Sequence, residues 1–206
     1  MCGRYWTEAD LEEKIKKVIG VPIDTLDMRR KRREQPAAVN IALGDIVPSC
    51  PALIVEKGDE GLILTQACWG YPSHKGTGLV INARAETAAE KPLFRESVKA
   101  RRCLIPSTGF YEWDAGKRKY FFTLPGERSP LYMAGLYDHR NGENCYCILT
   151  TAANASMRPI HDRMPLILTR EQGHNWLTDA GRAEDILAIT PPELERSSAE
   201  AQFSLW

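Results

Sequence analysis

The sequence lacks any long uninterrupted run of apolar residues. A membrane-spanning helix needs about 18 or more of them in succession, and no stretch of the 206-residue chain approaches that length. The N-terminus places Arg4, Glu8 and Asp10 where a signal peptide would need an apolar core. We therefore expect a cytoplasmic protein that makes no contact with a membrane.

The cysteines lack any regular pattern. The chain has six of them, with no Cys-x-x-Cys pair and no disulfide framework, and in a cytoplasmic protein such cysteines are expected to be free thiols. Cys145 and Cys147 alternate through an apolar stretch, which favours burial in a strand over metal ligation. We expect neither a metal site nor any other cofactor.

The chain also lacks net charge, because 27 Lys and Arg balance 27 Asp and Glu. No overall field steers a polyanion toward the protein, so any contact with nucleic acid must come from a local patch. The strongest cluster is the run of five cations from Arg29 to Arg33. This run fits either a solvated surface or a set of phosphate contacts.

Short apolar runs of β type dominate the chain beyond residue 50. Strands are expected at residues 52–55, 62–68, 79–81, 103–105, 110–113, 120–123, 132–137, 145–150 and 166–168. Helices are expected at residues 7–20, 87–100, 169–178 and 182–187, and residues 22–38 form an extended connection.

Turn residues indicate how these strands pair. Asp114-Ala115-Gly116 and Asn141-Gly142 are typical of hairpins, which join antiparallel strands. The sequence therefore predicts one α+β domain over residues 1–206, built as a curved, mainly antiparallel sheet or open pseudo-barrel with flanking helices.

Cys2 is the first candidate for chemistry. Removal of Met1 leaves an amine and a thiol on adjacent carbons, and an α-amine with a pKa of about 7.7–8.0 is partly neutral near pH 7. The amine can attack an aldehyde to form an imine, and the thiol can then close a five-membered thiazolidine. On this dipeptide alone, an ordinary second residue is the more common explanation.

Three further polar residues lie in or beside apolar strands. Asn82 follows the apolar run 79–81, where its amide could orient a ligand. Glu112 lies between aromatic residues, a setting that suits proton exchange, and His161 lies in a proline-bounded loop where it could shuttle a proton. Each also has an ordinary explanation. Asn82 could be a turn former, Glu112 an outward-facing strand residue, and His161 a loop histidine without a function.

Seven motifs occur in a fixed order: MCGRY at 1–5, VNIA at 39–42, CWGY at 68–71, INARAET at 81–87, GFYEW at 109–113, ILTTAAN at 148–154 and IHDRMP at 160–165. Together they resemble the SOS-response-associated peptidase (SRAP) family over nearly the whole chain. The resemblance implies a pseudo-barrel α+β fold. It also implies that the protein shields abasic sites in single-stranded DNA during the DNA damage or SOS response, by a covalent crosslink through the N-terminal cysteine.

The same resemblance implies roles for single residues. Cys2 would be the nucleophile, and Asn82 would position its amine and the incoming sugar. Glu112 would assist opening of the deoxyribose ring, and His161 would protonate leaving atoms and assist reversal. Lyase-type imine chemistry and thiol autopeptidase activity, which here would release only Met1, are implied as well.

A DNA groove is implied too, in which guanidinium groups take phosphates and aromatic rings take bases. Its expected residues are Arg4, Asn40, Trp69, Arg84 and Trp113. The chain departs from the family at Leu43, where a proline is usual, and after Tyr71, where tryptophan is usual. These departures bear on preference for junctions of single- and double-stranded DNA.

Two other functions compete with covalent capture. A cysteine peptidase could use Cys2 with His161 and would perform acyl chemistry. A non-catalytic module could bind single-stranded DNA through arginines and tryptophans alone, and its binding would survive loss of the Cys2 thiol. For each function we expect a monomer, associated with the nucleoid when DNA is bound.

Overall fold

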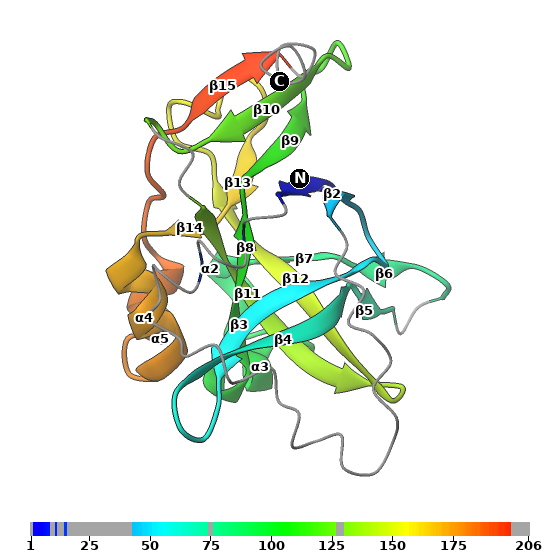
Figure 1. Cartoon of the computed structure of the whole chain (residues 1–206), viewed down its shortest axis with the longest axis vertical. Helices are drawn as coiled ribbons and strands as arrows, with labels where there is room; N and C mark the ends of the chain where they lie inside the picture. Colours follow the sequence, from blue (N-terminus) through cyan, green and yellow to red (C-terminus); the bar gives the residue numbers. More distant parts are fainter. Residues whose placement is uncertain are drawn as a thin grey trace.

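A computed structural model describes residues 2–8, 11, 15, 43–73, 76–126 and 130–198. Figure 1 shows a smaller sheet at the top, a larger strand assembly below it, and helices α4 and α5 on one side. The described N-terminal segment is part of the smaller sheet (Figure 1). Among the described residues, no helix is long and apolar enough to cross a membrane.

Five strands of the larger sheet close into a barrel. They are β3 (Pro51–Lys57), β4 (Leu62–Trp69), β8 (Arg102–Ser107), β11 (Leu131–Arg140) and β12 (Glu143–Ala152). Strands pair in the order β12, β4, β3, β8, β11, and β11 pairs back to β12. Within this ring, the pairings are antiparallel except for the parallel β12–β4 pairing. The expected antiparallel pseudo-barrel is confirmed, and this ring is closed.

The β11–β12 hairpin shows why the sequence folds in this way. Asn141 and Gly142 both have positive φ, at 54° and 86°. These values suit a two-residue turn whose twist matches that of the flanking strands. The hairpin therefore sets the register that brings both long strands into the ring.

Barrel strands bury both faces. Leu104 and Tyr132 face outward and share one core cluster with helix residues such as Trp176. Cys103 and Met133 lie on the opposite face and belong to a second cluster that contains the N-terminal segment. The second cluster connects the barrel interior to the smaller sheet.

The smaller sheet has the order β15-β10-β9-β1-β2. Its strands are β1 (Tyr5–Thr7), β2 (Gly44–Ile46), β9 (Gly109–Trp113), β10 (Lys119–Thr123) and β15 (Glu195–Ser198). The remaining strands are β5 (Tyr71–Pro72), β6 (Leu79–Val80), β7 (Asn82–Arg84), β13 (Arg163–Pro165) and β14 (Ile167–Leu168). β7 and β13 both pair with β12.

Helices cover the outer face of the barrel. They are α2 (Ala85–Ala88), α3 (Arg95–Ala100), α4 (Arg170–Thr178) and α5 (Ala183–Leu187). Helices α4 and α5 confirm the helices expected at residues 169–178 and 182–187. The helical stretch expected near 87–100 is confirmed in part, as α2 and α3 with a break between them. Pro92 lies in the break, because it lacks an N–H group and disfavours helix at the residue before it.

The N-terminal prediction is only partly tested. Thr7 ends β1 and does not begin a helix, whereas Leu11 and Ile15 are helical and buried. The rest of the expected helix, the connection 22–38 and the cation run Arg29 to Arg33 lie outside the described residues.

Candidate functional site

The N-terminal strand brings Cys2 to the junction of the two sheets. Tyr5 in β1 pairs with Ile46 on one side and with Phe110 on the other. The Cys2 side chain is fully buried, and its Sγ lies 3.7 Å from the carbonyl oxygen of Arg4. Burial raises the pKa of the Cys2 thiol far above its usual value, and the nearby Glu112 charge raises it further. The thiol is therefore protonated at neutral pH.

Asn82 connects Cys2 to the barrel. β7 lies parallel to β12, which places Asn82 opposite Ile148. The Asn82 Nδ2 group donates a hydrogen bond to the Cys2 carbonyl oxygen at 3.0 Å. The Asn82 Oδ1 atom is buried and accepts no hydrogen bond from the described residues. An acceptor is thus available beside the N-terminal residue.

Glu112 is the third buried polar group of this region. It lies in β9, opposite Tyr120 of β10, and only 3% of its surface is exposed. Its charge acts on the Cys2 thiol, which places the two side chains in electrostatic range of each other. Burial of a carboxylate costs free energy unless polar contacts compensate for the lost hydration.

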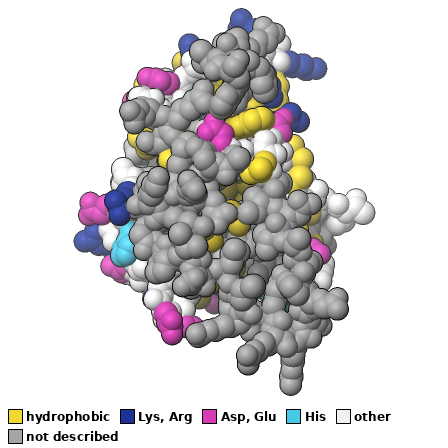
Figure 2. Space-filling model, in the orientation of Figure 1, with side chains coloured by type: hydrophobic (Ala, Val, Ile, Leu, Met, Phe, Trp, Pro, Cys, Tyr) yellow, Lys and Arg dark blue, Asp and Glu magenta, His cyan; other side chains and the backbone are white. Residues whose placement is uncertain are grey.

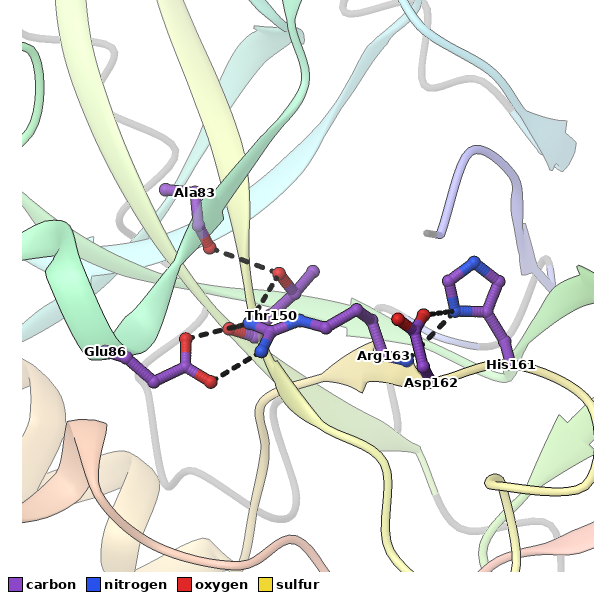
Figure 3. A network of polar contacts seen from close by, with 6 residues as sticks. All are labelled: Ala83, Glu86, Thr150, His161, Asp162 and Arg163. Atoms are coloured by element: carbon purple, nitrogen blue, oxygen red, sulfur yellow. Dashed lines mark hydrogen bonds and ion pairs between the residues drawn. The ribbon is translucent and has the colours of Figure 1, made fainter.

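His161 enters through the loop before β13. Its Nδ1 atom lies 2.9 Å from the Arg163 backbone nitrogen and 2.9 Å from Asp162 Oδ1 (Figure 3). An Nδ1 lone pair accepts from the Arg163 N–H group, whereas an Nδ1–H group donates to Asp162. The contact with Arg163 therefore needs an Nδ1 atom without a proton, and the contact with Asp162 needs an Nδ1 atom that carries one.

Asn154, which was not among the predicted site residues, anchors this loop. Its Nδ2 group donates to the carbonyl oxygens of Pro191 and Pro192, at 3.2 and 2.8 Å. Its Oδ1 atom accepts from Ser156 Oγ and from the Met157 backbone, at 2.7 and 3.3 Å. The only signal in the sequence was its place at the end of ILTTAAN.

Trp69 is a correction to the expected DNA groove. Its side chain is fully buried, stacks on Tyr146 at 6.3 Å between ring centroids, and lies 5.3 Å from the Tyr5 ring. The indole N–H donates to the carbonyl oxygen of Ile81 at 3.0 Å. Because its register partner Tyr146 lies on the same buried face, Trp69 offers no exposed ring to a base.

Other expected DNA contacts lie nearer the surface. Trp113 is partly exposed, and the Arg4 guanidinium carbon lies 5.9 Å from its ring centroid. Arg4 also pairs with Asp45 at 2.9 Å, and Arg84 is exposed. Asn40 lies outside the described residues. Figure 2 shows several Lys and Arg side chains around the smaller sheet.

Lys119 joins this group, although it was not among the residues expected in the DNA groove. Its Nζ atom lies 5.9 Å from the Trp113 ring centroid and 3.7 Å from the Tyr111 ring centroid. Lys119 and Trp113 are register partners, which places them on one face of the sheet. Partial burial lowers the pKa of Lys119.

All six cysteines are free thiols. Within the described part of the chain, no group of three or more His, Cys, Asp or Glu side chains is placed to hold a metal ion.

Known proteins are similar to this chain in sequence and in fold. Abasic site processing protein YoqW of Bacillus subtilis (strain 168) is 34% identical over 200 residues, which cover 91% of this chain and 84% of that protein. Abasic site processing protein YedK of Escherichia coli (strain K12) is 30% identical over 184 residues, covering 86% and 79%. A crystal structure from Bordetella bronchiseptica has a TM-score of 0.76 at 25% identity, covering 96% of this chain and 99% of that chain.

A family model described as SOS response associated peptidase (SRAP) matches residues 1–201. This match spans Cys2, Asn82, Glu112 and His161 alike. The chain belongs to the SRAP family.

Proposed function

We propose that this protein captures abasic sites in single-stranded DNA covalently, through the amine and thiol of Cys2 after Met1 is removed. The observation that carries the proposal is the contact of Asn82 with Cys2, which leaves a buried Oδ1 acceptor beside the N-terminal residue. The names of the relatives, which are abasic site processing proteins, support the substrate class.

The first bond forms between the Cys2 nitrogen and the aldehyde carbon of the ring-opened sugar. Asn82 Oδ1 accepts an N–H of the amine and so directs its lone pair toward the aldehyde. Glu112 accepts the proton of the sugar hydroxyl and returns one to the ring oxygen, which opens the ring. His161 donates its Nε2 proton to the departing hydroxyl of the carbinolamine, and the nitrogen lone pair forms the C=N bond. The remaining N–H proton of the adduct returns to the imidazole, so that one water and a neutral imine are left.

The second bond closes the thiazolidine. The Cys2 sulfur adds to the imine carbon, the C=N bond becomes single, and the thiol proton ends on nitrogen. One water is lost in total. The raised pKa of the Cys2 thiol fits this order, because a protonated thiol waits while the amine reacts. A thiolate peptidase would need the opposite environment, with a lowered thiol pKa.

The DNA strand is bound by cations and an aromatic ring, since the lesion itself has no base to recognise. The cations are Arg4, Arg84 and Lys119, and the ring is that of Trp113. Asn40 is included through the family motif alone. Because one chain carries all of these proposed site residues, the protein acts as a monomer in this proposal. It acts in the cytoplasm, on the DNA of the nucleoid.

The test uses a single-stranded oligonucleotide with one abasic site and an intact oligonucleotide as control. A denaturing gel should show a shifted band with the abasic strand only. Intact-mass analysis should give the mass of the protein without Met1, plus DNA, minus one water. Protein that lacks Met1 and forms no adduct would overturn the proposal.

Cys2 variants separate the two bonds. Cys2→Ser keeps the amine and removes the thiol, so we expect an imine that is trapped only when borohydride is added. Cys68→Ser, at a partly exposed thiol elsewhere, should crosslink like the unaltered protein. A stable adduct in Cys2→Ser without borohydride would contradict the thiazolidine.

A further inference from the structure

An ion pair joins the segment that carries Asn82 to the segment that carries His161. Arg163 Nη1 and Nη2 donate to Glu86 Oε1 and Oε2 at 2.5 and 2.8 Å (Figure 3). Such a bidentate pair fixes both the distance and the orientation of its partners. The Arg163 side chain is only 15% exposed, so its loss of hydration has to be compensated by these contacts.

Thr150 of β12 is the shared support of this pair. Arg163 Nη2 also donates to the Thr150 carbonyl oxygen at 2.7 Å, and Thr150 is fully buried. Thr150 is the register partner of Arg84 in β7 and of Pro165 in β13. The ion pair therefore spans the point at which both outer strands meet β12.

The backbone of Arg163 transmits this constraint to the His161 ring. In Figure 3, Glu86 and His161 lie at opposite ends of the Arg163 residue. The Arg163 N–H group donates to His161 Nδ1 at 2.9 Å, which in a neutral ring places the proton on Nε2. The competing partner, Asp162, has a side chain that is 88% exposed, so water weakens its hold on Nδ1.

We infer that Glu86 and Arg163 are positioning residues, which hold His161 in the tautomer that donates a proton from Nε2. This inference rests on the proposed function for the step in which the proton is used, but the tautomer itself can be measured separately. The guanidinium is engaged by Glu86 and Thr150.

Glu86→Gln is the central variant, because it removes the charge and keeps the shape. The crosslinking rate at saturating abasic single-stranded DNA should fall about tenfold, as expected when a general acid is misplaced but present. Affinity for an intact oligonucleotide should stay within about twofold. Glu96→Gln removes a carboxylate that pairs with Arg95 and Lys99 on α3, and this matched control should crosslink at the original rate.

The His161→Ala background tests whether the pair acts through the ring. We expect Glu86→Gln to slow that variant no further, since no imidazole is left to position. A full additional loss in the His161→Ala background would overturn the inference. Intact-strand affinity that falls as much as the rate would also overturn it, in favour of a phosphate-binding role for Arg163.

Nitrogen NMR of the His161 ring gives an independent readout at neutral pH. Its ring nitrogens should report the Nε2–H form in the unaltered protein and a mixture of both tautomers in Glu86→Gln. If no crosslink forms in any variant, the proposed function fails, while these spectra still decide the inference. An Nδ1–H form in the unaltered protein, or identical spectra in both proteins, would overturn it.

Discussion

The amide of Asn82 joins residues that are 80 positions apart in the sequence. It holds the Cys2 backbone with its donor and leaves its acceptor buried and open. Among the described residues this acceptor has no partner, and a buried acceptor without a partner costs about 1–3 kcal/mol. The Asn82 Oδ1 atom is therefore available for a further hydrogen bond. In the proposed function, the Cys2 amine completes that contact.

Asn82→Asp tests this residue with almost no change in shape. The aspartate has no N–H group for the Cys2 carbonyl oxygen and places two oxygens against it. We expect crosslinking to slow by about 10- to 100-fold, from a loss of about 1.4–2.7 kcal/mol in positioning. The measurement is single-turnover crosslinking at saturating abasic strand. Asn144→Asp, at a surface strand position that contacts His139, is the control. If Asn82→Asp crosslinks as fast as this control, Asn82 has no part in the site.

The two motif tryptophans should differ in what they support. Trp113→Ala removes a partly exposed ring and should weaken affinity for single-stranded DNA by about 1–3 kcal/mol without unfolding the protein. Trp69→Phe removes the hydrogen bond to Ile81 and should instead lower the free energy of unfolding by about 1–3 kcal/mol. Fluorescence anisotropy and urea unfolding separate the two effects. Equal losses of DNA affinity would show that Trp69 contacts the strand after all.

At the scale of elements, sequence patterns predicted the positions of the strands better than they predicted which face each side chain lies on. Short apolar runs predicted β3, β8 and β12, because both faces of these strands are largely buried. The run at 62–68 predicted β4, which is less completely buried. Trp69 was predicted in the DNA groove because the family motif identifies the residue. The motif does not show on which face of β4 its side chain lies. β1 was missed because three residues are too short for a pattern, and its pairing with Phe110 is set by tertiary structure.

The anchor of the His161 loop could not be predicted either. Asn154 binds carbonyl oxygens about 37 residues further along the chain, and no local pattern reveals such partners. By contrast, the helix start at Thr169 was readable, because its capping box lies within four residues. Local hydrogen bonds leave a signal in the sequence, whereas long-range ones do not.

Asn154→Ala should loosen the whole loop between β12 and β13. It removes four hydrogen bonds and leaves buried backbone groups of Pro191 and Met157 unsatisfied. We expect a loss of about 2–4 kcal/mol in the free energy of unfolding, together with slower crosslinking because His161 belongs to this loop. Urea unfolding and hydrogen exchange at residues 156–162 provide the check. Unchanged exchange in that loop would mean that other contacts hold it.

At the scale of the whole molecule, barrel closure buries groups that ionise in water. Cys2, Cys103 and Cys147 are fully buried, and burial raises the pKa of each thiol. Tyr5 and Tyr146, whose hydroxyls lie 2.6 Å apart, also have pKa values raised mainly by burial. The closed ring keeps these groups neutral above their ordinary pKa values, and it therefore makes the folded state sensitive to alkali.

Stability should therefore fall at high pH. Below the ordinary thiol pKa of 9.0, both the folded and unfolded states hold the proton, so these thiols give no pH dependence. Above it, the unfolded chain releases protons that the folded chain keeps, and each thiol favours unfolding by about 1.4 kcal/mol per pH unit. For Cys147 this continues until its folded pKa of about 12. Urea unfolding from about pH 7 to about pH 10.5 should give a plateau followed by a decline, and Cys147→Ala should decline less steeply. Equal stability at both ends of that range would mean that the interior admits enough water to ionise these groups.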